Sequence, residues 1–206
     1  MITRALLASK YVSGVAEILD TEPARVRTVF VPTAGSAYDT ASWIAVEREW
    51  LTRNGFPVED LELATASPEL VAEKLSNADM IYVAGGNTYF LLEHMQRTRF
   101  WKALEHHNPI YVGVSAGAIV TCPDIAHIAD LDERELAPGL ADTTAAGLVD
   151  FSILPHVDYP KVQDKITAIL SHWPDGKPLV KLNDDEAIVL EVGNWRIVKS
   201  GADDLS

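Results

Sequence analysis

The chain has 206 residues, of which 48% are hydrophobic and 23% are charged, as in folded globular proteins. This length suits a single domain, and we predict one domain over residues 1–206. The formal net charge of −13 disfavours a nucleic-acid partner, because binding to the phosphate backbone needs a basic surface.

The cellular setting is predicted from one cysteine and from the apolar runs. Cys122 is the only cysteine, which excludes an internal disulfide and fits a reducing compartment. No apolar run reaches the roughly 20 residues that a membrane-spanning helix needs, and the first residues do not resemble a signal peptide. We therefore expect a cytoplasmic protein without a membrane partner, either a monomer or a homodimer.

Apolar runs and helical periodicity alternate along the chain. The predicted strands are residues 3–8, 27–32, 79–85, 109–114, 149–155, 178–182, 187–192 and 195–198. The predicted helices are residues 40–54, 68–77, 88–105 and 160–172. This alternation predicts an α/β fold, with a mostly parallel sheet flanked by helices on both faces. Gly193-Asn194 lies between the last two strands and indicates a C-terminal hairpin.

The loops that follow the predicted strands are where we expect a site, since open α/β sheets bind ligands beyond the carboxyl ends of their strands. These loops are rich in small and polar residues. They are residues 33–42, 85–90, 115–118, 123–146 and 156–160.

Gly113-Val114-Ser115-Ala116-Gly117 has the pattern G-x-S-x-G. In a nucleophile elbow this pattern holds a serine on a sharp strand-to-helix turn, and the glycines let the neighbouring backbone approach closely. The N-terminus of the following helix also offers free N–H groups to a developing oxyanion. The alternative is a tight turn with a structural serine.

Gly85-Gly86-Asn87 follows a predicted strand and opens a predicted helix. Asn87 is a favourable N-cap and a possible pocket residue, and a glycine N–H here would complete an oxyanion hole with the N–H of Ala116. A tight strand–helix turn without a catalytic role is again the alternative. The motif is not G-x-G-x-x-G, and neither a P-loop nor a metal-ligand spacing occurs, so we expect no cofactor and no metal.

A nucleophilic serine needs a base, and His156 is the candidate. It alone among the six histidines follows a predicted strand at its carboxyl end, where Ser115 should also lie. The base in turn needs a carboxylate to fix its tautomer. Asp184, Asp185 and Glu186 follow the next predicted strand, and Asp130, beyond the predicted elbow, is the competing candidate.

Four segments together resemble one family. Residues 84–92, 113–125, 147–158 and 182–194 are similar, in this order, to peptidase family S51, which contains aspartyl dipeptidase (peptidase E) and cyanophycinase. The resemblance implies a class I glutamine amidotransferase-like fold. It also implies a serine peptidase that cleaves short peptides, such as dipeptides, through a Ser-His-carboxylate triad and an acyl-enzyme.

The resemblance also assigns roles to individual positions. Ser115 matches the nucleophile and His156 the catalytic histidine, while Gly86 and Ala116 match the oxyanion-hole positions. Asp184 falls where the aspartyl dipeptidases carry a glutamate, with Asp185 and Glu186 as neighbouring alternatives. Asp130 matches an aspartate that is also present in peptidase E.

Two features separate this chain from the aspartyl dipeptidases. The Asp-Asp-Glu run at 184–186 leaves the triad acid open among its members. The segment after His156 contains no arginine, only Lys161 and Lys165, and lysine lacks the bidentate geometry that suits a substrate carboxylate. The sequence therefore does not predict specificity for N-terminal aspartate.

Two other functions are compatible with parts of the sequence. An α/β-hydrolase esterase shares G-x-S-x-G, but its acid precedes the histidine, so Asp130 or Asp142 would serve. Against it, the chain has no HGGG-type motif, and several predicted strands follow His156. A non-catalytic binding protein on an amidotransferase-like fold is the second alternative, and the presence of both Ser115 and His156 disfavours it.

Overall fold

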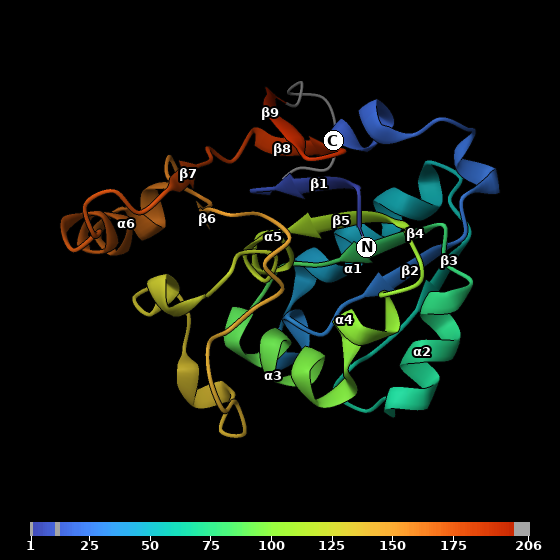
Figure 1. Cartoon of the computed structure of the whole chain (residues 1–206), viewed down its shortest axis with the longest axis horizontal. Helices are drawn as coiled ribbons and strands as arrows, with labels where there is room; N and C mark the ends of the chain where they lie inside the picture. The colour runs from blue at the N-terminus through green and yellow to red at the C-terminus, as the bar shows by residue number, and fades with distance from the viewer. Residues whose placement is uncertain (1, 11–12, 200–206) are drawn as a thin grey trace.

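The computed structural model describes residues 2–10 and 13–199 (Figure 1). A seven-stranded sheet has the strand order β3-β2-β4-β5-β1-β8-β9. Its strands are β1 (Arg4–Ala8), β2 (Thr28–Val31), β3 (Val58–Asp60), β4 (Met80–Val83), β5 (Ile110–Val114), β8 (Glu186–Glu191) and β9 (Asn194–Lys199). The strands from β3 to β1 are parallel to their neighbours, whereas β8 and β9 are antiparallel.

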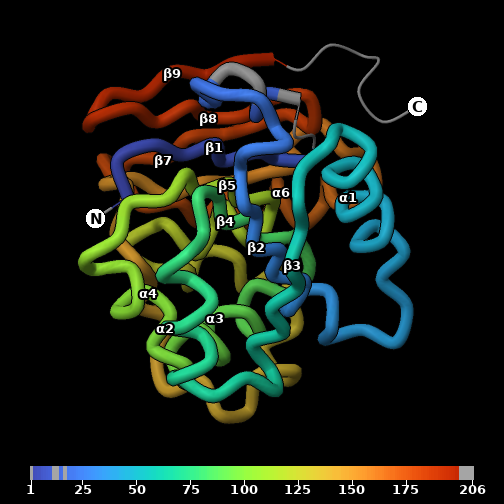
Figure 2. The backbone as a smooth tube through the Cα atoms, turned by 90° about the vertical axis from the view of Figure 1, so that its right-hand side faces the viewer, coloured from blue at the N-terminus to red at the C-terminus, as the bar shows by residue number. Residues whose placement is uncertain are grey.

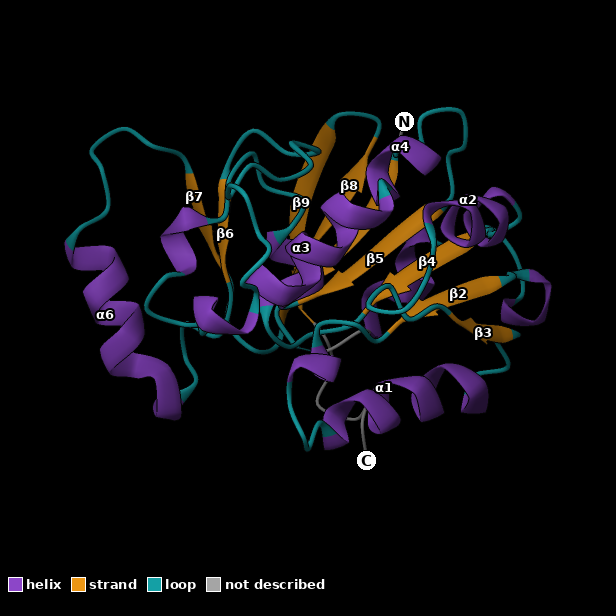
Figure 3. Ribbon diagram, turned by 90° about the horizontal axis from the view of Figure 1, so that it is seen from below, coloured by secondary structure: helices purple, strands orange, loops and turns teal. Residues whose placement is uncertain are grey.

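Helices cover both faces of this sheet (Figure 3). They are α1 (Ser42–Arg53), α2 (Pro68–Ser76), α3 (Thr88–Thr98), α4 (Phe100–Ala103) and α5 (Ala116–Ile119). The remaining α-helix, α6 (Gln163–Ser171), lies apart from this sheet (Figure 1). Successive side chains of β5 point to opposite faces of the sheet, so a hydrophobic core forms on each face. Tyr111 packs in the core with α2, α3 and α4, and Val112 packs in the opposite core with α1. The predicted α/β architecture is confirmed.

Residues 149–155 and 178–182, both predicted as strands, form a second sheet. β6 (Ser152–Leu154) and β7 (Leu179–Lys181) pair in parallel, and α6 connects them along the chain. Figure 1 shows this unit beside the main sheet, next to the carboxyl end of β5. Pattern alone does not say which sheet a strand joins, and this separate unit was not predicted.

Three local differences from the predicted elements have physical causes. β3 was missed because Val58-Glu59-Asp60 is a short, polar edge strand. The predicted helix 88–105 is broken at Arg99, whose φ of 57° is left-handed. The hairpin turn is Val192-Gly193, with φ of 47° and 80° as in a type I′ turn, so Asn194 already belongs to β9.

The chain path brings β1, β8 and β9 together along one side of the molecule (Figure 2). β1 lies between β5 and β8, so the start of the chain pairs with two later segments. Within residues 2–10 and 13–199, no helix has the length and apolar character to cross a membrane. A single domain over residues 1–206 stays a prediction.

Candidate active site

Ser115 lies on a sharp turn between β5 and α5. Its φ is 48° and its ψ is −106°, a backbone conformation that non-glycine residues rarely adopt. The N–H of Ser115 donates to the carbonyl of Ala8 in β1 over 2.9 Å, which ties the turn to the neighbouring strand. The sharp turn at Ser115 thus connects the end of β5 directly to the first turn of α5.

The two flanking glycines allow the turn to pack tightly. A Cβ at Gly113 would lie 2.3 Å from the carbonyl oxygen of Gly117, and one at Gly117 would lie 2.2 Å from that of Val83 in β4. The Tyr111 hydroxyl donates to the Gly117 carbonyl over 2.7 Å. Both glycines are therefore required by close backbone approach, which brings the first turn of α5 onto the sheet.

A second turn, between β4 and α3, lies beside the first. Gly86 has a φ of 145°, and a Cβ there would lie 2.2 Å from the carbonyl oxygen of Ala34. Asn87 caps α3, because its Oδ1 accepts from the N–H of Phe90 over 2.8 Å. Asn87 is fully buried and does not line the cavity, so its prediction as a pocket residue is wrong and its role as an N-cap is confirmed.

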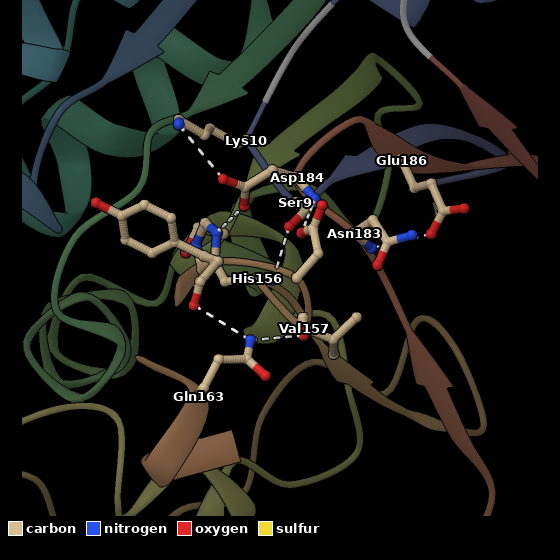
Figure 4. Close-up of polar contacts among 11 residues, drawn as sticks. Ser9, Lys10, His156, Val157, Gln163, Asn183, Asp184 and Glu186 are labelled. Atoms are coloured by element: carbon tan, nitrogen blue, oxygen red, sulfur yellow. Dashed lines mark hydrogen bonds and ion pairs between the residues drawn. The ribbon is translucent and has the colours of Figure 1, made fainter. Parts of the chain in front are cut away.

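His156 lies between a serine and a carboxylate. Its Nε2 is 3.0 Å from Ser115 Oγ, and its Nδ1 is 2.6 Å from Asp184 Oδ1 (Figure 4). The backbone N–H of His156 donates to Ser9 Oγ over 2.8 Å, and its φ of 62° is again left-handed. The expected contact between the 184–186 loop and the imidazole is thus confirmed.

The contacts of Asp184 fix its position and favour its ionised form. Lys10 Nζ is 3.3 Å from its Oδ2, and its backbone N–H donates to Asp158 Oδ1 over 2.7 Å. Burial acts to raise the pKa of Asp184, but the hydrogen bond and charge of His156, together with Lys10, outweigh it and leave this pKa below its usual value. The carboxylate is therefore ionised where it meets the imidazole.

The neighbouring acids of this loop contact a different residue. Lys199 Nζ lies 3.6 Å from Asp185 Oδ2 and 3.3 Å from Glu186 Oε1. Glu186 Oε2 also accepts from the N–H of Asn183 over 2.9 Å, away from His156 (Figure 4). Of the three residues in the run, Asp184 is the one that contacts the imidazole.

Asp130 and Asp142, the two acids that an α/β-hydrolase would use, are not in the site. Asp130 and Asp142 are both exposed, and neither lines the cavity. Asp132 does so instead, and its Oδ2 accepts from the N–H of Thr88 at the start of α3 over 2.7 Å. Asp130, the competing candidate for the triad acid, is therefore exposed, whereas Asp132 in the same irregular segment after α5 lines the cavity.

Ser115 and His156 line a cavity of about 450 Å³. It is lined by Ser9, Lys10, Tyr38, Trp43, Glu47, Gly85, Gly86, Thr88, Val114, Ser115, Ile119, Leu131, Asp132, Pro155, His156, Tyr159, Val162 and Asp184. The sequence did not single out Trp43 or Glu47, since both lie within α1, beyond the loop that follows β2. Within the described ranges, no cluster of His, Cys, Asp or Glu side chains is arranged to hold a metal ion.

Comparison with known proteins identifies the family. The family model of peptidase family S51 matches residues 9–198, most of the chain. The chain belongs to peptidase family S51. It is therefore a peptidase, and the matched range contains Ser115, His156 and Asp184.

Other S51-like proteins resemble the chain over most of its length. It is 33% identical over 165 residues to an uncharacterised peptidase of Pasteurella multocida, covering 78% of this chain and 79% of the relative. It is 34% identical over 164 residues to an uncharacterised peptidase of Listeria monocytogenes, covering 78% and 80%. A crystal structure from Listeria monocytogenes, assigned provisionally to peptidase E, matches with a TM-score of 0.88 at 28% identity, covering 98% of this chain and 100% of that one. The fold is the class I glutamine amidotransferase-like fold that the sequence predicted.

Proposed function

We propose that this S51 peptidase is of the serine type and hydrolyses short peptides through Ser115, His156 and Asp184. The observation that carries the proposal is the chain of contacts from Ser115 Oγ to His156 Nε2, 3.0 Å, and from His156 Nδ1 to Asp184 Oδ1, 2.6 Å. Nucleophile, base and orienting acid are then all within hydrogen-bond reach of the next group.

In the acylation step, Ser115 Oγ attacks the carbonyl carbon of the scissile peptide bond while His156 Nε2 takes the hydroxyl proton. Asp184 accepts from Nδ1–H and stabilises the imidazolium that forms. The tetrahedral intermediate collapses when His156 gives the proton to the leaving amine, and an acyl-enzyme on Ser115 remains. Water, deprotonated by His156, then attacks the ester carbon. The second tetrahedral intermediate collapses when His156 returns the proton to Ser115 Oγ, which breaks the ester bond and releases the carboxylic acid product.

The oxyanion of each tetrahedral intermediate needs hydrogen-bond donors, and we assign these to the N–H groups of Ala116 and Gly86. Ala116 is the first residue of α5, so its N–H has no acceptor within the helix. Gly86 lines the same cavity, and Gly85 brings this turn against the elbow, since a Cβ on Gly85 would lie 3.3 Å from Ser115 Cβ. Such preorganised donors are worth about 10²- to 10³-fold in kcat.

A small peptide is the substrate that the cavity supports best. Its volume of about 450 Å³ lies within the range of small-molecule sites, and apolar side chains such as Trp43, Ile119 and Leu131 contribute to its walls. The proposal is a dipeptidase or a related short-peptide hydrolase. An α/β-hydrolase esterase is disfavoured because the acid that contacts His156 follows it in the chain.

The test is hydrolysis of a panel of short peptides by the wild type and by Ser115→Ala. Loss of the nucleophile should lower kcat by several orders of magnitude, about 10⁶-fold in a comparable serine protease. A serine-directed phosphonate should label the wild type on Ser115, with Ser76→Ala, on the distant helix α2, as a matched control that keeps both activity and labelling. Full activity in pure Ser115→Ala protein would rule out Ser115 as the nucleophile.

A further inference from the structure

Glu47 is a buried carboxylic acid in the wall of the cavity that contains Ser115. Glu47 is 8% exposed. It belongs to α1, which covers the face of the sheet opposite to α3 (Figure 3). Trp43, one helical turn earlier, also lines the cavity and donates from Nε1 to the Gly85 carbonyl over 3.1 Å. The α1 wall is thereby attached to the turn beside Ser115.

The one group that can partner the Glu47 carboxyl among the described residues is the hydroxyl of Tyr82 in β4. This contact is imperfect, since neither Glu47 Oε2 nor the Tyr82 hydroxyl makes a hydrogen bond of ordinary geometry, although the hydroxyl is close enough to lower the pKa of Glu47. A buried polar group without a partner costs roughly 1–3 kcal/mol. An apolar side chain at this position would avoid that cost, which indicates that the carboxyl is there to meet a ligand.

Acidic side chains outnumber basic ones in the cavity lining, which favours a ligand with an ammonium group. Three carboxyl groups line it, those of Glu47, Asp132 and Asp184. Lys10 is the one lysine or arginine among the described residues of the lining, and it contacts Asp184 at 3.3 Å. The other basic side chain of the described lining, His156, also contacts Asp184. A positively charged substrate group would therefore meet an excess of acidic side chains.

We propose that Glu47 binds a primary ammonium group of the peptide substrate. This inference rests on the proposed peptidase function and names the substrate class of the same site. Two sources share this chemistry, the free N-terminus of the peptide and a lysine side chain. In either case the substrate carries an ammonium group, at a free N-terminus or on a lysine side chain.

Binding of the ammonium group should release a proton. Burial raises the pKa of Glu47 to about 8, although the contact with Tyr82 opposes part of this rise. At pH 7 the empty site therefore holds a neutral carboxylic acid. An ammonium ion favours the carboxylate, so the acid proton leaves to the buffer and an ion pair remains.

The experiment is calorimetric binding of dipeptides at pH 7 to full-length Ser115→Ala protein, which does not consume them. The probes are Leu-Leu, with an N-terminal ammonium, N-acetyl-Lys-Leu, with a side-chain ammonium, and N-acetyl-Leu-Leu, with neither. At least one ammonium-bearing probe should bind about 10- to 100-fold more tightly than N-acetyl-Leu-Leu, and the tighter one identifies the source. Equal affinity for all three would overturn the proposal.

Two further measurements assign this preference to Glu47. Titration in two buffers of different ionisation enthalpy should show up to one proton released by the preferred probe. Glu47→Gln should remove both the release and the preference, whereas Glu49→Gln, an exposed residue of the same helix paired with Arg53, should keep both. Proton release is measured with Glu47 in place, so its absence overturns the proposal even if Glu47→Gln does not fold.

The outcome is separable from that of the proposed function. Hydrolysis by the wild type and its loss in Ser115→Ala test the triad without reference to Glu47. If the triad is supported but Glu47→Gln has wild-type KM for the ammonium-bearing probes, the ammonium site is refuted and the serine mechanism stands.

Discussion

At the scale of single residues, backbone strain is concentrated at the proposed triad. Four non-glycine residues in the described part of the chain have positive φ, and Ser115 and His156 are two of them. A left-handed conformation costs a non-glycine residue of order 1–2 kcal/mol, and it persists only where the surroundings enforce it. Here the hydrogen bonds to Ala8 and Ser9 hold the two backbones. The strain aims both side chains at one point, as a catalytic role requires.

Ser115 and His156 should act as a unit. We expect His156→Ala to lower kcat nearly as much as Ser115→Ala does, and the double variant to lose little more. Steady-state kinetics of the three variants would measure this, and losses that multiply in the double variant would mean that His156 only supports the fold.

The acid can be tested with a matched pair of neighbouring residues. Asp184→Asn keeps the shape of the side chain but favours the wrong tautomer of His156, and a comparable change in a serine protease costs about 10⁴-fold in kcat. Asp185→Asn removes a carboxylate that is paired with Lys199 and not with His156, so its kcat should stay near that of the wild type. Equal losses in the two variants would contradict the assignment of Asp184.

At the scale of elements, the sequence predicted the two active-site turns but not the whole cavity. G-x-S-x-G and Gly-Gly-Asn have local signatures, because a sharp turn or a cap restricts residue type at fixed spacing. His156 and Asp184 were placed by the rule that ligand sites lie at the carboxyl ends of strands. The contribution of α1, and the choice of Asp132 over Asp130, depend on how distant segments pack, for which no local pattern exists.

The Gly86 turn allows a test of close backbone packing. Gly86→Ala would place a Cβ 2.2 Å from the Ala34 carbonyl, so the turn must move. Gly55→Ala is the control, since Gly55 also has positive φ, 85°, but has nothing within 4 Å of an added Cβ. Urea unfolding should show a loss of about 1–2 kcal/mol for Gly55→Ala and a larger loss for Gly86→Ala. Similar losses would mean that backbone conformation alone, and not the approach of Ala34, determines the cost.

At the scale of the whole molecule, the fold positions the site by bringing together distant parts of the chain. Ser9 follows β1, Ser115 follows β5, and His156 and Asp184 follow β6 and β7 of the second sheet. Because β1 pairs with β5, Ser9 and Ser115 leave the main sheet at the same end. The bond from the N–H of His156 to Ser9 Oγ then connects the second sheet to that end. The triad therefore depends on how the two sheets pack.

The buried acid of the cavity wall should also affect the stability of the whole fold. The pKa of Glu47 is raised from 4.5 to about 8 in the folded protein, so between these values the folded state keeps a proton that the unfolded state has lost. The free energy of unfolding should therefore decrease as the pH rises from about 4.5 to about 8, by a few kcal/mol from this residue. Asp184, whose pKa is lowered, has the opposite dependence, but its contribution is lost only as the pH falls below about 4.

Urea unfolding of the wild type and of Glu47→Gln at several pH values from 5 to 9 would isolate this effect. The substituted amide does not ionise, so we expect the variant to gain stability relative to the wild type as the pH rises, with the gain levelling off above about 8. Glu49→Gln changes an exposed carboxyl of the same helix, and its difference from the wild type should stay nearly constant. A constant difference for Glu47→Gln as well would mean that Glu47 is ionised in the folded protein at neutral pH. Ammonium binding could then release no proton from Glu47, and the proposed ammonium site would be refuted.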